Sequence, residues 1–89
     1  MNFVYSNNCI YLKNEENKII AEVTFPFVEK DVVEIDHTFV DESLRGQGIA
    51  SLLLEKAYES IKEQGLKAKP TCSYAVKWFE KHPEKQDIL

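Results

Sequence analysis

The chain of 89 residues is long enough for one small domain, residues 1–89, near the lower size at which a single core holds a fold together. Hydrophobic residues make up 44% and charged residues 29% of the chain, which is typical of a globular protein and argues against a disordered segment. The net charge of −4 argues against a nucleic-acid partner, because no basic patch offsets the repulsion from phosphates.

The two cysteines, Cys9 and Cys72, stand far apart and fit neither a disulfide-rich scaffold nor a Cys-x-x-Cys metal site. The first residues, MNFVYSNN, lack the basic and apolar regions of a signal peptide. No apolar run approaches the roughly 20 residues that a membrane-spanning helix needs. We therefore expect a cytoplasmic protein with reduced thiols, no metal and no membrane partner.

The first half of the chain predicts three strands. Residues 9–12 (CIYL) are a short β-prone run that ends at the polar turn signal of residues 14–17. Residues 18–27 (KIIAEVTFPF) alternate in the manner of a half-buried strand, and residues 32–40 (VVEIDHTFV) predict a third strand after a polar turn. Alternation places on one face Val33, Ile35, His37 and Phe39, and on the other Val32, Glu34, Asp36, Thr38 and Val40.

After residue 48 the apolar period becomes helical. The predicted apolar face comprises Ile49, Leu52, Leu53, Ala57 and Ile61. Gly65 stands where a glycine just after a helix is expected. Residues 66–71 predict a short strand, and residues 74–81 (YAVKWFEK) predict a second helix, capped by Ser73 and ended by His82-Pro83. The order β-β-β-α-β-α predicts an α+β (α/β-like) fold with helices packed on a mixed sheet.

Two of the three glycines, Gly46 and Gly48, stand behind Arg45 at the start of the first predicted helix. The amides of a first helical turn have no intrahelical acceptor, and the helix dipole makes this end electropositive. Glycines let such amides approach a bulky anion without an intervening Cβ, and Arg45 can add a charge-assisted contact. The same glycines also suit a plain strand-to-helix turn, so these residues by themselves leave both a phosphate cradle and a simple turn open.

The hexapeptide RGQGIA differs from the dinucleotide-binding and P-loop patterns. It resembles R/Q-x-x-G-x-G/A, the acyl-CoA pyrophosphate motif of the GNAT superfamily of N-acetyltransferases. A second block, EIDHTFV with KPTCSYAVKWFEKHPE, is similar to the small single-domain (Yjdj-type) branch of that superfamily, over residues 19–86. The resemblance implies a mainly antiparallel sheet and a CoA pyrophosphate held by the backbone amides of Arg45, Gly46, Gln47, Gly48, Ile49 and Ala50.

The resemblance also implies how the thioester is handled. The strand before the motif offers a backbone amide to the thioester oxygen, with contacts expected around Phe39 and Val40. A carboxylate of this strand, Glu34 or Asp36, is a candidate general base, although both also suit solvated strand positions. Tyr74 is similar in position to the tyrosine that protonates the CoA thiolate. Other members carry about 150 residues, with an N-terminal helical segment that shapes the acceptor site.

Cys72 and His37 predict a second chemistry. Cys72 precedes the second predicted helix, whose N-terminus favours a reactive thiol, and His37 on the neighbouring strand is a candidate base. The prediction is an acetyl-Cys72 intermediate or a cysteine-assisted transfer. The alternative is a buried cysteine that packs as a small hydrophobe.

Together these features predict an acetyl-CoA-dependent N-acetyltransferase that modifies an amine of a small molecule or of a protein. Acetyl-CoA is the expected co-substrate, and the acidic charge favours a cationic acceptor. One alternative is a catalytically weak module that binds acetyl-CoA or CoA. Another is a small structural domain whose glycine turn binds nothing. The sequence determines neither the acceptor nor the oligomeric state.

Overall fold

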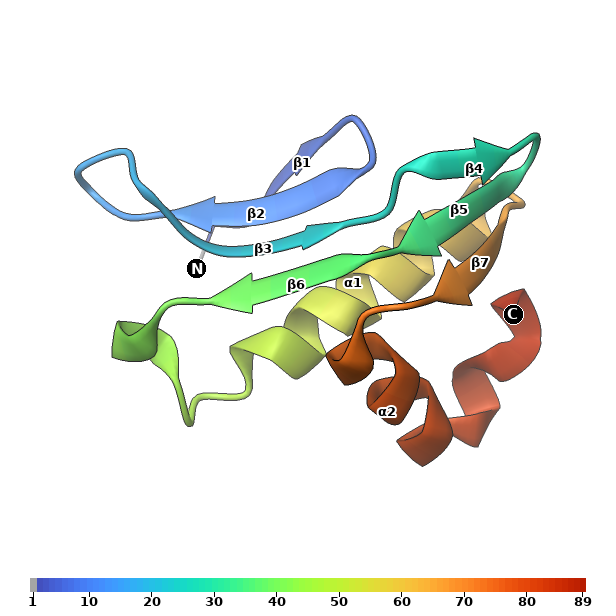
Figure 1. The fold of residues 1–89 in the computed structure, drawn as a ribbon. Coiled ribbons are helices and arrows are strands. Elements are labelled where there is room, and N and C mark those ends of the chain that lie inside the picture. The colour runs from blue at the N-terminus through green and yellow to red at the C-terminus, as the bar shows by residue number, and fades with distance from the viewer. Residues whose placement is uncertain (1) are drawn as a thin grey trace.

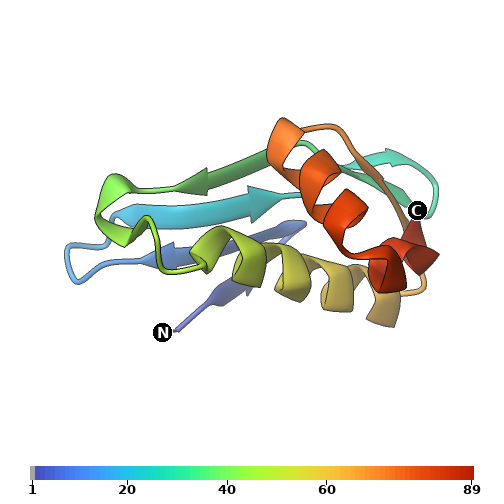
Figure 2. The same ribbon diagram turned by 90° about the horizontal axis from the view of Figure 1, so that it is seen from below.

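The computed structural model describes residues 2–89 as a twisted sheet with both α-helices on one face (Figures 1 and 2). The elements in chain order are β1 (Val4–Ser6), β2 (Cys9–Lys13), β3 (Ile19–Thr24), β4 (Phe27–Glu29), β5 (Val32–Ile35), β6 (His37–Val40), η1 (Glu42–Leu44), α1 (Ile49–Glu63), β7 (Lys67–Pro70), α2 (Ser73–Lys81) and η2 (Pro83–Ile88). The predicted α+β class is confirmed. Within residues 2–89 no helix is both long and apolar enough to cross a bilayer.

The strands form two connected sections. Strands β1, β2, β3 and β6 pair antiparallel in that order, while β5 pairs antiparallel with β4 and parallel with β7. The parallel pair requires a crossover, which α1 supplies. Because β7 pairs with β5 and not with β6, the edge of β6 opposite β3 has no strand partner among residues 2–89. At this open edge the two sections of the sheet separate, because β6 belongs to one section and β7 to the other.

Asp36 lies between β5 and β6 and shifts the alternation of side chains by one residue. The Asp36 N–H lies 3.3 Å from the Thr24 carbonyl oxygen, although Thr24 pairs with His37. Two residues therefore oppose one, as in a β-bulge. Val33 and Ile35 are buried on the helix-covered face before the bulge, and after it the inward residues have even numbers. The predicted placement of His37 and Phe39 on the face of Val33 and Ile35 is therefore wrong.

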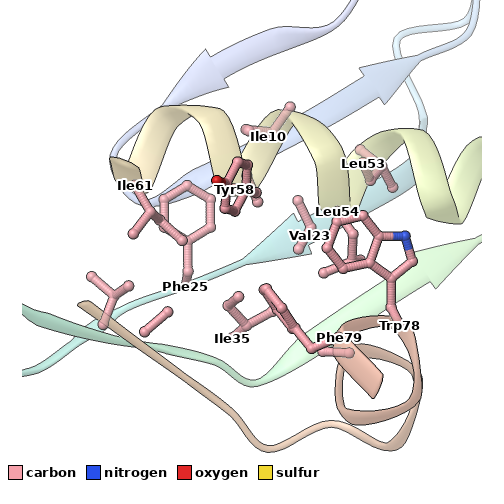
Figure 3. Packing of buried hydrophobic residues seen from close by; sticks show 14 of the residues in the cluster. Ile10, Val23, Phe25, Ile35, Leu53, Leu54, Tyr58, Ile61, Trp78 and Phe79 are labelled. Atoms are coloured by element: carbon pink, nitrogen blue, oxygen red, sulfur yellow. The ribbon is translucent and has the colours of Figure 1, made fainter. Parts of the chain in front are cut away.

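One hydrophobic cluster joins the helices to the sheet (Figure 3). Both helices contribute, and the largest fully buried side chains are Phe79, Ile10, Ile35, Leu53, Leu54, Ile61, Val23 and Val33. The α1 face is rotated from the predicted one, since Leu54 is 0% exposed whereas Leu52 is 36% exposed. The predicted helix end is confirmed, because Gly65 follows the Gln64 C-cap with a φ of +72°.

The C-terminal turn η2 was missed in the sequence and is fastened to α1 by Asp87. The Tyr58 hydroxyl donates to Asp87 Oδ1 at 2.7 Å, and Lys62 Nζ lies 2.9 Å from Asp87 Oδ2. Lys67 Nζ also donates to the Asp87 carbonyl oxygen at 2.8 Å. These bonds close the C-terminal end over Tyr58 and leave Ile88 buried in the core.

We expect Asp87→Asn to lower the melting temperature at pH 7. Hydrogen bonds from Lys62 and Tyr58 hold the pKa of Asp87 below its ordinary value of 3.8. A lowered folded-state pKa stabilises the fold above the unfolded pKa, and this contribution is lost as the pH falls through the folded pKa. The difference in melting temperature from wild type should therefore shrink below about pH 3.8. Thermal scans from pH 2 to 8 check this, and Glu59→Gln, on the exposed side of α1, is the control.

Candidate functional site

A cavity of about 320 Å³ opens where β6, the loop after η1, the start of α1 and the first turn of α2 meet. Its walls are partly apolar and partly polar. The lining residues are Thr38, Val40, Leu44, Arg45, Gly46, Gly48, Ile49, Ala50, Ser51 and Tyr74. The predicted phosphate-cradle loop therefore borders a real cavity, and it does so together with the open edge of β6.

The glycines of the loop adopt backbone conformations that favour glycine. Gly46 has a φ of +83° and Gly48, the N-cap of α1, has a φ of +74°. A Cβ built at either position meets no protein atom within 4 Å, so packing within the chain does not demand glycine there. Both residues line the cavity, and a Cβ would therefore occupy space that a ligand can use.

The first turn of α1 offers free backbone donors to this cavity. No side chain caps the helix at Gly48, and the Gly48 carbonyl accepts a hydrogen bond from the Leu52 N–H at 3.1 Å. The amides of Ile49, Ala50 and Ser51 therefore lack intrahelical acceptors and lie at the positive end of the helix dipole. Such an end is an anion-binding site.

The loop that carries Arg45 is held from the preceding turn. Asp41 Oδ2 accepts hydrogen bonds from the Ser43 N–H at 3.0 Å and from the Ser43 hydroxyl at 2.6 Å, and these bonds lower the pKa of Asp41. Leu44 packs against the hydrophobic cluster. Arg45 borders the cavity and forms no ion pair within residues 2–89, so its guanidinium can meet an anionic ligand.

The open edge of β6 presents two backbone amides beside the cavity. The Asp41 N–H donates to the Ile20 carbonyl of β3 at 2.8 Å. Since successive amides of an antiparallel strand point to opposite edges, Phe39 shares the direction of Asp41, while Thr38 and Val40 point away from β3. Val40 therefore offers a free N–H on the cavity side. The Phe39 side chain lies on the outer face, where Phe39 pairs with Glu22.

Cys72 lies on the inner side of the bulge, next to a residue of the cavity wall. Its Sγ lies 3.5 Å from the Thr38 hydroxyl and accepts a hydrogen bond from the Ala75 N–H at 3.4 Å. Cys72, and not the predicted Ser73, is thus the N-cap of α2. The Cys72 sulfur therefore lies at the N-terminal end of α2.

His37 does not meet Cys72. After the bulge His37 and Thr38 point to opposite faces, and His37 Nε2 lies 3.5 Å from Glu22 Oε1 with the His37 side chain 53% exposed. The Cys9 thiol donates to the other oxygen of Glu22 at 3.7 Å. The pairing of His37 as the base of Cys72, expected from the sequence, is not formed in this structure.

Tyr74 projects from the first turn of α2 into the cavity wall and is 40% exposed. Burial raises the pKa of its phenol. The phenol therefore keeps its proton at neutral pH and can act as a donor. Ser51, in the first turn of α1, accepts a hydrogen bond from Trp78 Nε1 at 2.9 Å, and this bond joins the two helices beside the cavity.

The two candidate carboxylates already accept hydrogen bonds from threonines. The Thr71 hydroxyl donates to Glu34 Oε2 at 2.6 Å, and the Thr24 hydroxyl donates to Asp36 Oδ1 at 2.6 Å. Both carboxylates lie where β5 gives way to β6, and neither lines the cavity. Across residues 2–89 no group of three His, Cys, Asp or Glu side chains is arranged to hold a metal ion.

The cavity wall thus includes the residues predicted to bind the cofactor, except Phe39 on the strand and Gln47 in the loop. Sequence reasoning missed Thr38, Leu44 and Ser51 as wall residues. Ser51 could have been found as the third residue of the predicted helix. Thr38 could not, because the bulge that turns it inward leaves no mark on an alternating sequence.

Comparisons with known proteins place the chain in a family. Residues 9–88 match the family described as GCN5-related N-acetyl-transferase. The chain is 36% identical to the human protein NATD1 over 63 residues, which cover 71% of this chain and 56% of that protein. It therefore spans little more than half the length of such relatives.

Solved structures extend the likeness to the whole domain. A GCN5-like putative N-acetyltransferase from Staphylococcus aureus is 36% identical and superimposes with a TM-score of 0.82. The likeness covers 98% of this chain and 85% of that one. Rv2747 from Mycobacterium tuberculosis, solved in complex with CoA, shares the fold with a TM-score of 0.67 at 15% identity, over 85% of this chain and 47% of that one. The chain belongs to the family of GCN5-related (GNAT) N-acetyltransferases.

Proposed function

We propose that this protein binds acetyl-CoA in the cavity and transfers its acetyl group to an amine. The observation that carries the proposal is that one cavity is lined by two groups of residues, one suited to an anion and the other to a thioester. At one end stand the free amides of α1, two glycines with positive φ, and Arg45. At the other end stand the open edge of β6 and the Tyr74 hydroxyl. An elongated molecule with an anionic end and a thioester end matches this order.

The residues divide the work of the transfer. The amides of residues 49–51 and Arg45 would hold the pyrophosphate. The Val40 N–H would donate to the thioester oxygen and stabilise the negative charge that develops on it when the amine attacks. As the C–N bond forms and the C–S bond breaks, the Tyr74 hydroxyl would give its proton to the departing thiolate. The amine loses a proton to solvent or to a carboxylate, for which Glu34 and Asp36 are the candidates.

Cys72 supports a second route. Its Sγ contacts Thr38, a wall residue, and lies at the N-terminus of α2. In this route the Cys72 thiol attacks the thioester, the C–S bond to CoA breaks, and the thiol proton ends on the CoA sulfur. Acetyl-Cys72 then passes the acetyl group to the amine. The exposed His37 is not placed to take part as the base of the thiol.

One set of samples tests both routes. We expect acetyl-CoA to bind in calorimetric titration, and primary amines from a panel to accelerate the release of CoA. A tryptic peptide with acetylated Cys72 during turnover, and loss of turnover in Cys72→Ala, would support the thiol route; full turnover in Cys72→Ala would exclude it. Binding without amine-dependent release would instead identify a module that binds CoA and does not catalyse transfer.

A further inference from the structure

The face of the sheet opposite the helices carries two cross-strand ladders of side chains. The strand register sets side by side a first ladder of Val4, Tyr11, Glu22 and Phe39, and a second ladder of Ser6, Cys9, Thr24 and His37. The residues between them in β2 and β3, Ile10 and Val23, are 0% exposed beneath the helices, so both ladders lie on the outer face. No helix of residues 2–89 covers this outer face (Figures 1 and 2).

The first ladder places a carboxylate between two aromatic rings. Glu22 lies opposite Tyr11 in β2 and opposite Phe39 in β6. Its side chain is 25% exposed, and Phe39 is 38% exposed. An aromatic face attracts an ammonium group, and a carboxylate beside the ring adds the opposite charge. The combination fits a lysine, whose apolar stem can lie along a ring while its ammonium group stays near the carboxylate.

One lysine of the chain already binds a ring of this ladder. Lys13 Nζ lies 5.5 Å from the centroid of the Tyr11 ring. Among the described residues no lysine or arginine lies over Phe39 in the same way. Within residues 2–89 the only ion-pair partner of Glu22 is His37, at 3.5 Å. The Phe39 ring and the Glu22 carboxylate therefore form a place for a second ammonium group, which the chain does not supply.

The charge of this face favours a cationic partner over a second copy of the chain. Asp36 Oδ1 accepts a hydrogen bond from the Thr24 hydroxyl at 2.6 Å, and this bond holds a second carboxylate beside the ladders. Glu22 and Asp36 thus outnumber Lys13. A second copy would bring the same carboxylates against each other, whereas a cationic segment complements them.

The width of the face and its position favour a polypeptide. The first ladder crosses four strands, a width of about 14 Å, which exceeds a small amine. The ladders end at the open edge of β6, where Phe39 faces outward while Thr38 and Val40 line the cavity. Only one edge strand separates a group bound on Phe39 from a group in the cavity. A neighbouring lysine of the same segment has the flexible four-carbon stem needed to pass this edge.

We propose that the outer face around Tyr11, Glu22 and Phe39 binds a polypeptide segment that carries several lysines, and that one of these lysines is the acceptor amine. One lysine docks on Phe39 and Glu22, and another reaches the thioester around the edge of β6. The transfer is the one given above: the C–N bond forms, the C–S bond breaks and CoA leaves as the thiol. The acceptor part of the inference rests on the proposed function, whereas binding to the face does not.

Binding is measured without turnover. The probe is a blocked hexapeptide in which lysine alternates with threonine, titrated into ¹⁵N-labelled protein without cofactor. Amide resonances of β2, β3 and β6 should shift, and the affinity should fall as sodium chloride is added. Phe39→Thr and Glu22→Gln should each weaken binding about fivefold. Phe27→Thr should not, because Phe27 is 54% exposed but pairs with Val33 on the opposite face.

Turnover tests the delivery of the amine. With the lysine peptide as acceptor, Glu22→Gln should raise the KM about fivefold and leave kcat unchanged, because Glu22 holds the segment and does not touch the reacting atoms. With butylamine, which cannot occupy the face and the cavity together, Glu22→Gln should match wild type. Slower turnover of both acceptors would overturn the docking role, since the variant would then have altered the cavity itself.

The remaining outcomes separate this inference from the proposed function. The inference is overturned if the peptide shifts no resonance of the outer face, or if a peptide with glutamate in place of lysine, or spermidine, binds equally well. Dimerisation of the protein through this face would also overturn it. If the lysine peptide binds as expected but acetyl-CoA does not bind, the docking face stands and the proposed function falls. If butylamine is acetylated but the peptide does not bind, the proposed function stands and the docking face falls.

Discussion

Gly48→Ala should lower the affinity for acetyl-CoA about a hundredfold or more, while Gly65→Ala leaves the affinity unchanged. The two glycines have nearly the same φ, +74° and +72°, and a Cβ at either meets no protein atom within 4 Å. The cost of placing alanine at positive φ is therefore shared by both variants. Only Gly48 borders the cavity, so only there does the new Cβ stand between the amides and a ligand.

The size of the effect follows from the contacts that are lost. A hydrogen bond to a charged group contributes about 1.5–3 kcal/mol, and a Cβ at the N-cap obstructs the approach to more than one amide of the first turn. A loss of about 2.7 kcal/mol corresponds to a hundredfold in the dissociation constant. Acetyl-pantetheine, which has the thioester end and lacks the pyrophosphate, should bind both variants as it binds wild type.

The measurement is calorimetric titration of acetyl-CoA and of acetyl-pantetheine into wild type, Gly48→Ala and Gly65→Ala. Thermal melting confirms that each variant is folded. Equal affinity of wild type and Gly48→Ala for acetyl-CoA would mean that the loop is a turn and that the pyrophosphate lies elsewhere. Loss of affinity in Gly65→Ala as well would mean that strain, and not obstruction, is responsible.

The course of the chain was predictable wherever a local pattern decides the structure. The helical period after Gly48, the glycine at position 65 and the polar turn before Val32 are each determined within a few residues. The first two are found as predicted, and the turn lies at residues 30–31, directly after β4. β1 and η2 were missed because their residues carry weak patterns and are held by partners distant in sequence, as Asp87 is by Tyr58.

The bulge at Asp36 accounts for most of the features of the site that could not be predicted from the sequence. The segment VVEIDHTFV shows no break in its alternation of side chains. A shift of the strand pairing by one residue therefore leaves two regular halves, one on each side of the shift, in which opposite sets of side chains point inward. The pairing of Thr24 with both Asp36 and His37 decides where the shift occurs. The extra residue, Asp36, turns Thr38 and Val40 toward the cavity and turns His37 and Phe39 outward. His37 is thereby separated from Cys72.

The glycine loop could be predicted because its requirements are local: positive φ, free amides and no Cβ. The partners of that loop are not local. Leu44 depends on the capped turn at Asp41, and Ser51 reaches Trp78 only after α2 has folded back over β7. A motif therefore locates one wall of the cavity, and the topology supplies the others.

Leu54→Ala should lower the free energy of unfolding by about 3–5 kcal/mol, whereas Leu52→Ala should lower it by less than about 1 kcal/mol. Leu54 is 0% exposed in the cluster shown in Figure 3, and truncation leaves a cavity as well as a loss of apolar burial. Small domains are stable by only about 5–15 kcal/mol, so the Leu54 variant should melt roughly 15 °C or more below wild type. Urea unfolding at equilibrium measures both variants.

The matched pair isolates the orientation of α1, because both substitutions remove the same atoms from the same helix. Two residues apart on a helix means about 200° of rotation, so Leu52 and Leu54 cannot both face the core. The i, i+3, i+4 pattern from Ile49 predicts that Leu52 faces the core, whereas in the structure Leu54 faces the core and Leu52 is exposed. If Leu52→Ala proved the costlier change, α1 would be rotated toward the face predicted from the sequence. Ser51 would then turn away from Trp78, and the cavity wall described here would not form.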